Sequence, residues 1–175
     1  MAELVAPTVS LHRAWLDARD EWGRDVVQPG SGLHEAAGVD SPEVFATWVG
    51  RLLASADESV PVADDRVHAT YWWIVEDGAV LGSISLRHRL NDFLLAAGGH
   101  IGYSVRPSAR KRGLATWAVG LVLAYARRMG LDRVLITCDD ANTASARVIV
   151  GNGGVLEDVR ETTLGPTRRY WITLD

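Results

Sequence analysis

The chain has 175 residues and a formal net charge of −4, and 47% of its residues are hydrophobic. These values predict one domain over residues 1–175 and exclude a general polyanion-binding surface, so we expect no nucleic-acid partner. The single cysteine, Cys138, excludes an intrachain disulfide and a cysteine-based zinc site. No signal peptide or membrane-spanning apolar run is apparent, and we expect a cytoplasmic protein without a membrane partner.

Helical and strand patterns alternate along the chain, which favours an α/β fold. A proline after Ser41 marks one helix start, Asp77-Gly78 is a hairpin turn, and Gly130 is a C-cap. The predicted helices cover residues 12–24, 41–56, 114–129 and 142–150. The predicted strands cover residues 4–9, 68–76, 79–89, 99–105, 132–138, 155–163 and 168–174. Connections are expected at 27–39, 57–66 and 90–98, with a Gly165-Pro166 turn between the last two strands.

A basic turn precedes the best-defined helix. Arg110, Lys111 and Arg112 lie where that helix begins, although a helix N-terminus already carries about half a positive charge. Basic side chains there are unfavourable unless an anion occupies the helix end. We therefore predict an anion site, most plausibly for phosphate.

Small residues support this interpretation of the basic turn. Arg110, Gly113 and Ala115 match the pattern [QR]-x-x-G-x-[GA] between an apolar strand and an amphipathic helix. Small side chains allow backbone N–H groups to approach a pyrophosphate, and the cations add attraction. The alternative is a surface basic turn in which Gly113 serves only tight packing.

Two segments, IGYSVRPSARKRGLA and LDRVLITCDDANTASARVIVGNGG, give the chain a specific resemblance over about residues 99–154. The chain resembles the GNAT superfamily of acetyl-coenzyme A-dependent N-acetyltransferases. This resemblance implies an α/β (α+β) fold with a mixed, mainly antiparallel sheet of about six or seven strands and about four flanking helices. It also implies that the fourth and fifth strands splay apart around the cofactor.

The resemblance implies that acetyl-coenzyme A is the co-substrate and that no metal is needed. The Val105 amide would act as an oxyanion donor to the thioester carbonyl. For Asn142, a plain helix N-cap is the alternative to cofactor contact. The residues implied to hold the cofactor are Ser104, Val105, Arg110, Lys111, Arg112, Gly113, Leu114, Ala115, Thr116 and Asn142.

The catalytic acid and base are not evident from the sequence. Many family members carry a tyrosine at the position of Ile149, where it protonates the departing thiolate; here the proton would come from Ser145, from water, or from no group before product release. His100 and Asp139 are the candidate bases. Their alternatives are a hydrogen-bonded sheet histidine and an acid that caps the next turn.

Other chemistry-bearing residues have simpler structural interpretations. Cys138 lies in an apolar strand, which favours a buried, inert thiol. Trp72 and Trp73 should point to opposite faces of their strand, one into the core and the other toward a substrate groove.

The predicted function is direct transfer of an acetyl group from acetyl-coenzyme A to a primary amine of a small molecule or peptide. The alternative is a non-catalytic acyl-coenzyme A-binding module for regulation or assembly. Family members often form dimers, so a homodimer is a possible assembly.

Overall fold

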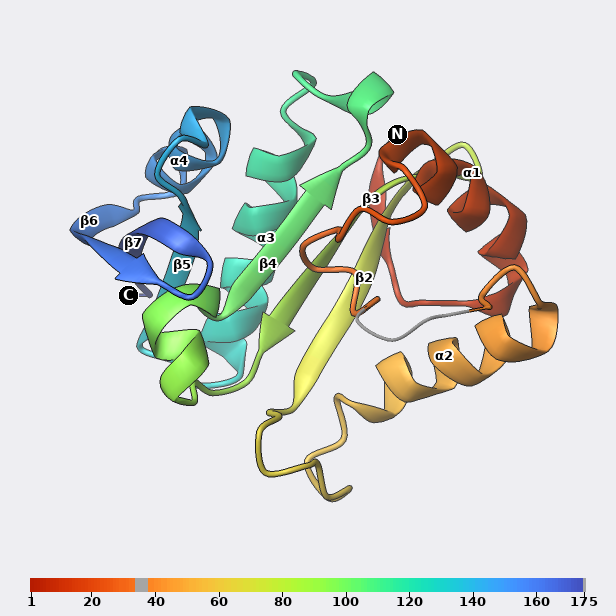
Figure 1. Ribbon diagram of the computed structural model, residues 1–175, viewed down its shortest axis with the longest axis horizontal. Coiled ribbons are helices and arrows are strands. Elements are labelled where there is room, and N and C mark those ends of the chain that lie inside the picture. The colour runs from red at the N-terminus through yellow and green to blue at the C-terminus, as the bar shows by residue number, and fades with distance from the viewer. Residues whose placement is uncertain (34–37, 175) are drawn as a thin grey trace.

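The computed structural model describes residues 1–33 and 38–174 (Figure 1). Residues 34–37 of the predicted 27–39 loop lie outside the described residues. The helices are α1 (His12–Trp22), α2 (Pro42–Ala54), α3 (Leu114–Arg128) and α4 (Thr143–Gly151), with short helical turns η1 (Val9–Leu11), η2 (Leu94–Gly98) and η3 (Pro107–Ala109). The strands are β1 (Glu3–Val5), β2 (Ala69–Glu76), β3 (Ala79–Arg87), β4 (Ile101–Val105), β5 (Arg133–Asp139), β6 (Val155–Thr162) and β7 (Gly165–Thr173).

The strands form two antiparallel sheets that meet between β4 and β5. One sheet has the order β1-β2-β3-β4 and the other β5-β7-β6. At the seam, His100 N donates to Leu135 O at 2.7 Å, and beyond this bond the two strands belong to separate sheets. The mixed α/β fold with splayed fourth and fifth strands is therefore confirmed.

Helices cover both faces of the first sheet (Figure 1). On one face, α3 buries Val119 and Val122 against the first sheet, and Ile149 joins this core from α4, which packs against α3 and β5. On the other face, α1 and α2 pack an aromatic core against Trp73. Strand alternation assigns Trp73 to this aromatic core, whereas Trp72 packs edge-on against Tyr125 at 5.0 Å between ring centroids. Neither tryptophan lines the two cavities described below.

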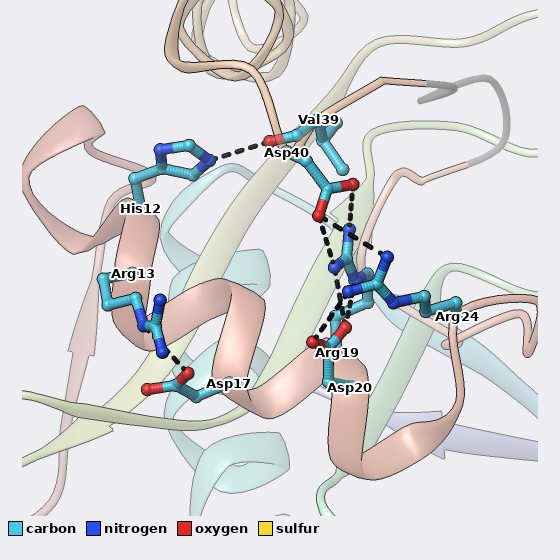
Figure 2. Close-up of polar contacts among 8 residues, drawn as sticks. All are labelled: His12, Arg13, Asp17, Arg19, Asp20, Arg24, Val39 and Asp40. Atoms are coloured by element: carbon cyan, nitrogen blue, oxygen red, sulfur yellow. Dashed lines mark hydrogen bonds and ion pairs between the residues drawn. The ribbon is translucent and has the colours of Figure 1, made fainter.

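An ion cluster attaches α1 to the segment before α2 (Figure 2). Arg19, only 5% exposed, donates to both Asp20 and Asp40. His12 Nε2 donates to Val39 O at 2.7 Å. Because the guanidinium is buried and fully paired, it fixes residues 38–40 on α1 rather than serving a ligand.

Several predicted boundaries and faces need correction. The 90–98 connection contains the π-helical turn η2, and the last hairpin turns at residues 163–164, because Gly165 and Pro166 already pair in β7. The first strand ends at Val5, before Pro7. On α3, apolar residues at spacings of three and four predict one buried face that includes Trp117 and Leu121, but these two are 36% and 44% exposed. The residues buried on this helix are Leu114, Ala118, Val119, Val122, Leu123 and Ala126.

Candidate functional site

A cavity of about 640 Å³ lies at the end of β4, bounded by the turn into α3 and the first turn of α4. Trp22 and Pro29 close it from the side of α1. Of the residues predicted from the sequence, the structure brings together Ser104, Val105, Arg110, Lys111, Gly113, Leu114, Ala115, Thr116, Asn142 and Ser145 in its lining.

The N-terminus of α3 presents unpaired amides to this cavity. Gly113 is the N-cap with φ of 78° and makes no side-chain cap, and the first helical bond runs from Trp117 N to Gly113 O. The amides of Leu114, Ala115 and Thr116 are therefore left without a helical partner. Lys111 also has a positive φ, 62°, so the turn curls its backbone around a concave surface suited to an anion.

The three cations of the basic turn have different environments. Arg110 donates from Nε to Val105 O at 3.1 Å, and its guanidinium lies 4.8 Å from the ring centroid of Trp22. Lys111 lines the cavity. Arg112 lies outside the lining and pairs with Glu76 at 2.5 Å. Arg110 and Lys111 therefore supply the positive charge that faces the cavity.

The end of β4 offers a free amide and a buried hydroxyl. Arg106 N donates to Leu81 O on β3, so strand alternation turns the Val105 N–H to the opposite edge, toward the splay. Ser104 Oγ is buried and has no hydrogen-bond partner among the described residues. An unpaired buried hydroxyl in a cavity wall is typical of a site that receives a polar ligand.

Tyr103 and Ser145 form a hydroxyl pair across the cavity, joining β4 to α4. Their oxygens are 2.7 Å apart, and burial raises the pKa of Tyr103 to about 12. Asn142 caps α4 by accepting from Ser145 N at 3.0 Å and also lines the cavity. Ile149 is fully buried in the core. The hydroxyl pair, rather than the usual tyrosine position on α4, thus faces the cavity.

His100 and Asp139, the two candidate bases, lie outside the cavity lining. His100 Nδ1 accepts from Leu135 N at 2.9 Å, and burial, with the charge of Arg87, lowers its pKa to about 4. Asp139 accepts from Ala141 N at 2.7 Å and caps the turn before α4. His100 is therefore a hydrogen-bonded histidine of the sheet and Asp139 an acid that caps a turn, which are the structural alternatives to a catalytic base.

The C-terminal end of α1 holds the segment between β4 and the basic turn through Glu21, a residue that sequence reasoning missed. Glu21 accepts from Ser108 N at 2.5 Å, from Ser108 Oγ at 2.9 Å and from Arg106 Nε. Burial raises the pKa of Glu21, but these bonds outweigh it and the pKa is lowered overall. No local pattern could have revealed this contact, because 87 residues separate Glu21 from Ser108.

A second cavity, of about 350 Å³, lies on the α1–α2 face of the sheet. Its wall includes Tyr71, Ser85 and Arg87 from β2 and β3, and Leu94 from η2. Pro29 lines both cavities, so the two share a wall. We call this second cavity the Arg87 cavity.

Comparison with known proteins gives a consistent family. The model of the acetyltransferase (GNAT) domain matches residues 33–155. No curated sequence matches this chain closely enough to assign a relative. The described residues contain no group of three or more His, Cys, Asp or Glu side chains placed to hold a metal ion, and none of the described helices is long and apolar enough to span a membrane.

Solved structures share this fold at low identity. An acetyltransferase from Salmonella typhimurium that modifies the N-terminal serine of ribosomal protein L7/L12 is 19% identical, with a TM-score of 0.69 over 99% of this chain and 95% of its own. A ribosomal-protein-S5-alanine acetyltransferase from Vibrio fischeri is 17% identical, with a TM-score of 0.73 over 99% and 92%. RimJ of Mycobacterium smegmatis, solved with a coenzyme A disulfide, is 19% identical, with a TM-score of 0.72 over 98% and 81%.

Proposed function

Because the chain belongs to the GNAT acetyltransferase family and uses acetyl-coenzyme A as co-substrate, we propose that its acceptor is the α-amino terminus of a polypeptide. Family membership identifies an enzyme that acetylates an amine, and this sets aside the non-catalytic binding module. The observation that carries the site assignment is the single cavity joining the amides of α3, the Val105 N–H and the Ser145 hydroxyl.

The residues of the cavity suit the parts of acetyl-coenzyme A. We propose that the amides of Leu114, Ala115 and Thr116 bind the pyrophosphate, with Arg110 and Lys111 as charge partners. Acetyl-coenzyme A supplies the activated acetyl group as a thioester. The Val105 N–H points toward the gap between β4 and β5 and donates to the thioester carbonyl oxygen. This contact favours attack of the acceptor amine on the carbonyl carbon of the thioester.

Ser145 and Tyr103 stabilise the sulfur that departs. With a pKa of about 12, Tyr103 keeps its proton at neutral pH. Full proton transfer from it to a thiolate of pKa about 8.5 is uphill by roughly 4–5 kcal/mol. We therefore assign the pair a hydrogen-bonding role: Ser145 donates to the sulfur, and Tyr103 orients Ser145 through the 2.7 Å contact.

Two arguments support an α-amine as the acceptor. The Salmonella and Vibrio neighbours are described as acting on a ribosomal protein's terminal serine and on ribosomal protein S5. In addition, an α-amine with a pKa near 8 is about 10% free base at pH 7, whereas a lysine amine is far below 1%. The described cavity wall carries no carboxylate or imidazole, which suits an amine that needs little help to lose its proton.

A peptide assay tests this function. A peptide with a free amino terminus and one internal lysine is incubated with the protein and acetyl-coenzyme A, and fragment masses locate the acetyl group. We expect acetylation at the terminus, with a rate that rises with pH toward 8, and none on the same peptide with a blocked terminus. Acetylation of lysine alone would contradict the proposal, whereas failure to bind coenzyme A in calorimetric titration would contradict the site.

Three expectations from the sequence remain predictions: one domain over residues 1–175, a cytoplasmic location and a homodimer.

A further inference from the structure

Arg87 is a largely buried cation whose guanidinium is only partly used. Its Nη1 donates to Gly98 O at 2.9 Å and to Gly99 O at 3.1 Å, which holds the end of η2. Among the described residues, no hydrogen bond or ion pair engages Nε or Nη2. Burial lowers the pKa of Arg87 and is opposed only by the neighbouring Tyr71, so its charge is held in a poorly solvated place.

The other buried or partly buried arginines of the described chain each contact a carboxylate. Arg19 pairs with Asp20 and Asp40, Arg169 with Glu157 and Asp158, Arg106 with Glu21, and Arg168 with Asp140. Arg87 has no such partner among the described residues. A buried charge without a counter-ion is unfavourable, and among residues 1–33 and 38–174 this contrast singles out Arg87 as the buried cation able to receive an anionic ligand.

Arg87 lines a cavity that has further polar groups in its wall. The wall of the Arg87 cavity also includes Tyr71, Ser85 and Asn91, and the exposed, oppositely charged Asp65 and Arg66. Ser85 lies beside Tyr71 and Gly102 in the sheet register. Hydroxyl and amide donors around a guanidinium form a set that suits a carboxylate.

We propose that the Arg87 cavity binds a carboxylate of the acceptor, so that the preferred substrate is a polypeptide with an acidic side chain close to its amino terminus. This inference rests on the proposed function, because the acceptor must place its amine in the neighbouring cavity. Pro29, which lines both cavities, is the wall that such an acceptor passes.

The sheet geometry limits how far the acid lies from the amine. A Cβ added at Gly102 would be 3.6 Å from Arg87 Nη2, so this nitrogen lies beside Gly102. In this proposal the amine of the acceptor lies near Ser104, which lines the neighbouring cavity. Gly102 precedes Ser104 by two residues of strand, which is about 7 Å. An extended acceptor spans the same length in two residues, and the acid therefore belongs at the third residue.

Peptide competition with the intact enzyme tests the inference without any mutation. Peptides of seven residues that begin with serine and carry Asp, Asn or Lys at the third position, without other charged side chains, are compared at one salt concentration. We expect kcat/KM for the Asp peptide to exceed that for the Asn peptide about tenfold, as for one charge-assisted contact, with Lys lowest. Moving Asp to the sixth position should abolish the preference.

Equal rates for the Asp and Asn peptides would overturn the inference and leave the proposed function intact. Coenzyme A binding without acetylation of any peptide, or acetylation of free aspartate in preference to all peptides, would overturn both.

Variants separate recognition from a purely structural role of Arg87. We expect Arg87→Gln to lower the ratio of kcat/KM for the Asp and Asn peptides to about 1. Arg87→Lys should retain part of the preference for the Asp peptide. If Arg87 only holds Gly98 and Gly99, both peptides lose the same factor and the ratio persists, which overturns the inference. Arg89→Gln is the matched control, since Arg89 is exposed and lies outside the cavity wall, and its ratio should equal that of the wild type.

Discussion

The two cavities of this enzyme differ in how they are built. The cavity that we propose for the cofactor, called the cofactor cavity below, is formed mainly by two short stretches, 103–116 and 142–148, and presents backbone amides and small residues. The Arg87 cavity gathers side chains from residues 29–32, 65–71 and 85–94. One site therefore depends on local backbone geometry, and the other on side chains that tertiary folding brings together, so substitutions should alter acceptor choice far more readily than cofactor choice.

The largest expected effect is on the cofactor cavity. Gly113→Asp places a Cβ at a φ of 78° and a negative charge beside the amides that we propose bind the pyrophosphate. We expect coenzyme A affinity to fall by about 1,000-fold, from backbone strain and charge repulsion together. Calorimetric titration measures this change. Gly130→Asp is the control, because Gly130 has a similar φ of 87° at the other end of α3 and open space around it; an equal loss there would mean that strain alone is responsible.

The seam between the two sheets should respond to acid. The pKa of His100 is about 4 in the folded protein, below its ordinary 6.5, so the unfolded chain binds more protons between these values. The free energy of unfolding should therefore fall as pH drops from 6.5 to 4, by about 2–3 kcal/mol. Denaturant unfolding at several pH values measures it. His100→Gln should flatten this dependence, and an unchanged slope would show that His100 is not its source.

Loss of the Ser145 hydroxyl should affect the chemical step and leave binding intact. We expect Ser145→Ala to lower kcat roughly 10- to 100-fold, as for removal of one transition-state hydrogen bond, with coenzyme A affinity within about twofold of wild type. Tyr103→Phe should lower kcat less, because it acts through Ser145. Steady-state kinetics and titration separate the two effects. A larger loss of kcat in Tyr103→Phe than in Ser145→Ala would contradict the assignment, because it would mean that Tyr103 rather than Ser145 contacts the sulfur.

A smaller effect is expected where Glu21 of α1 supports the segment between β4 and the basic turn. Glu21→Gln weakens the bonds to Ser108 and Arg106 and should raise KM for acetyl-coenzyme A roughly fivefold with little change in kcat. Since the pKa of Glu21 is lowered by folding, its contribution is complete above about pH 4.5 and disappears as pH falls through its folded pKa. Asp17→Asn, an exposed position on α1, is the control; an equal rise there would assign the effect to helix charge.

The sequence predicted the elements whose cause is local and missed those whose cause is tertiary. The basic turn, Gly113 and the strand ending at Val105 follow from nearest neighbours, and they lie where expected. The face of α3 was misplaced because Trp117 and Leu121 are apolar yet exposed. Arg87 follows Ser83 and Ser85 in an alternating strand pattern that does not distinguish it, and only the fold shows that no acid among the described residues pairs with it. Glu21 and Ser108 meet through packing that no short pattern records.

The single thiol of the chain has a practical consequence for every rate proposed above. Cys138 is buried, and burial raises its pKa, so at neutral pH it is protonated and shielded from a water-soluble disulfide reagent. Each turnover releases coenzyme A, whose thiol is exposed in solution. A colorimetric thiol reagent should therefore follow catalysis continuously with almost no background from the native enzyme, and slow colour development without substrate would report unfolding.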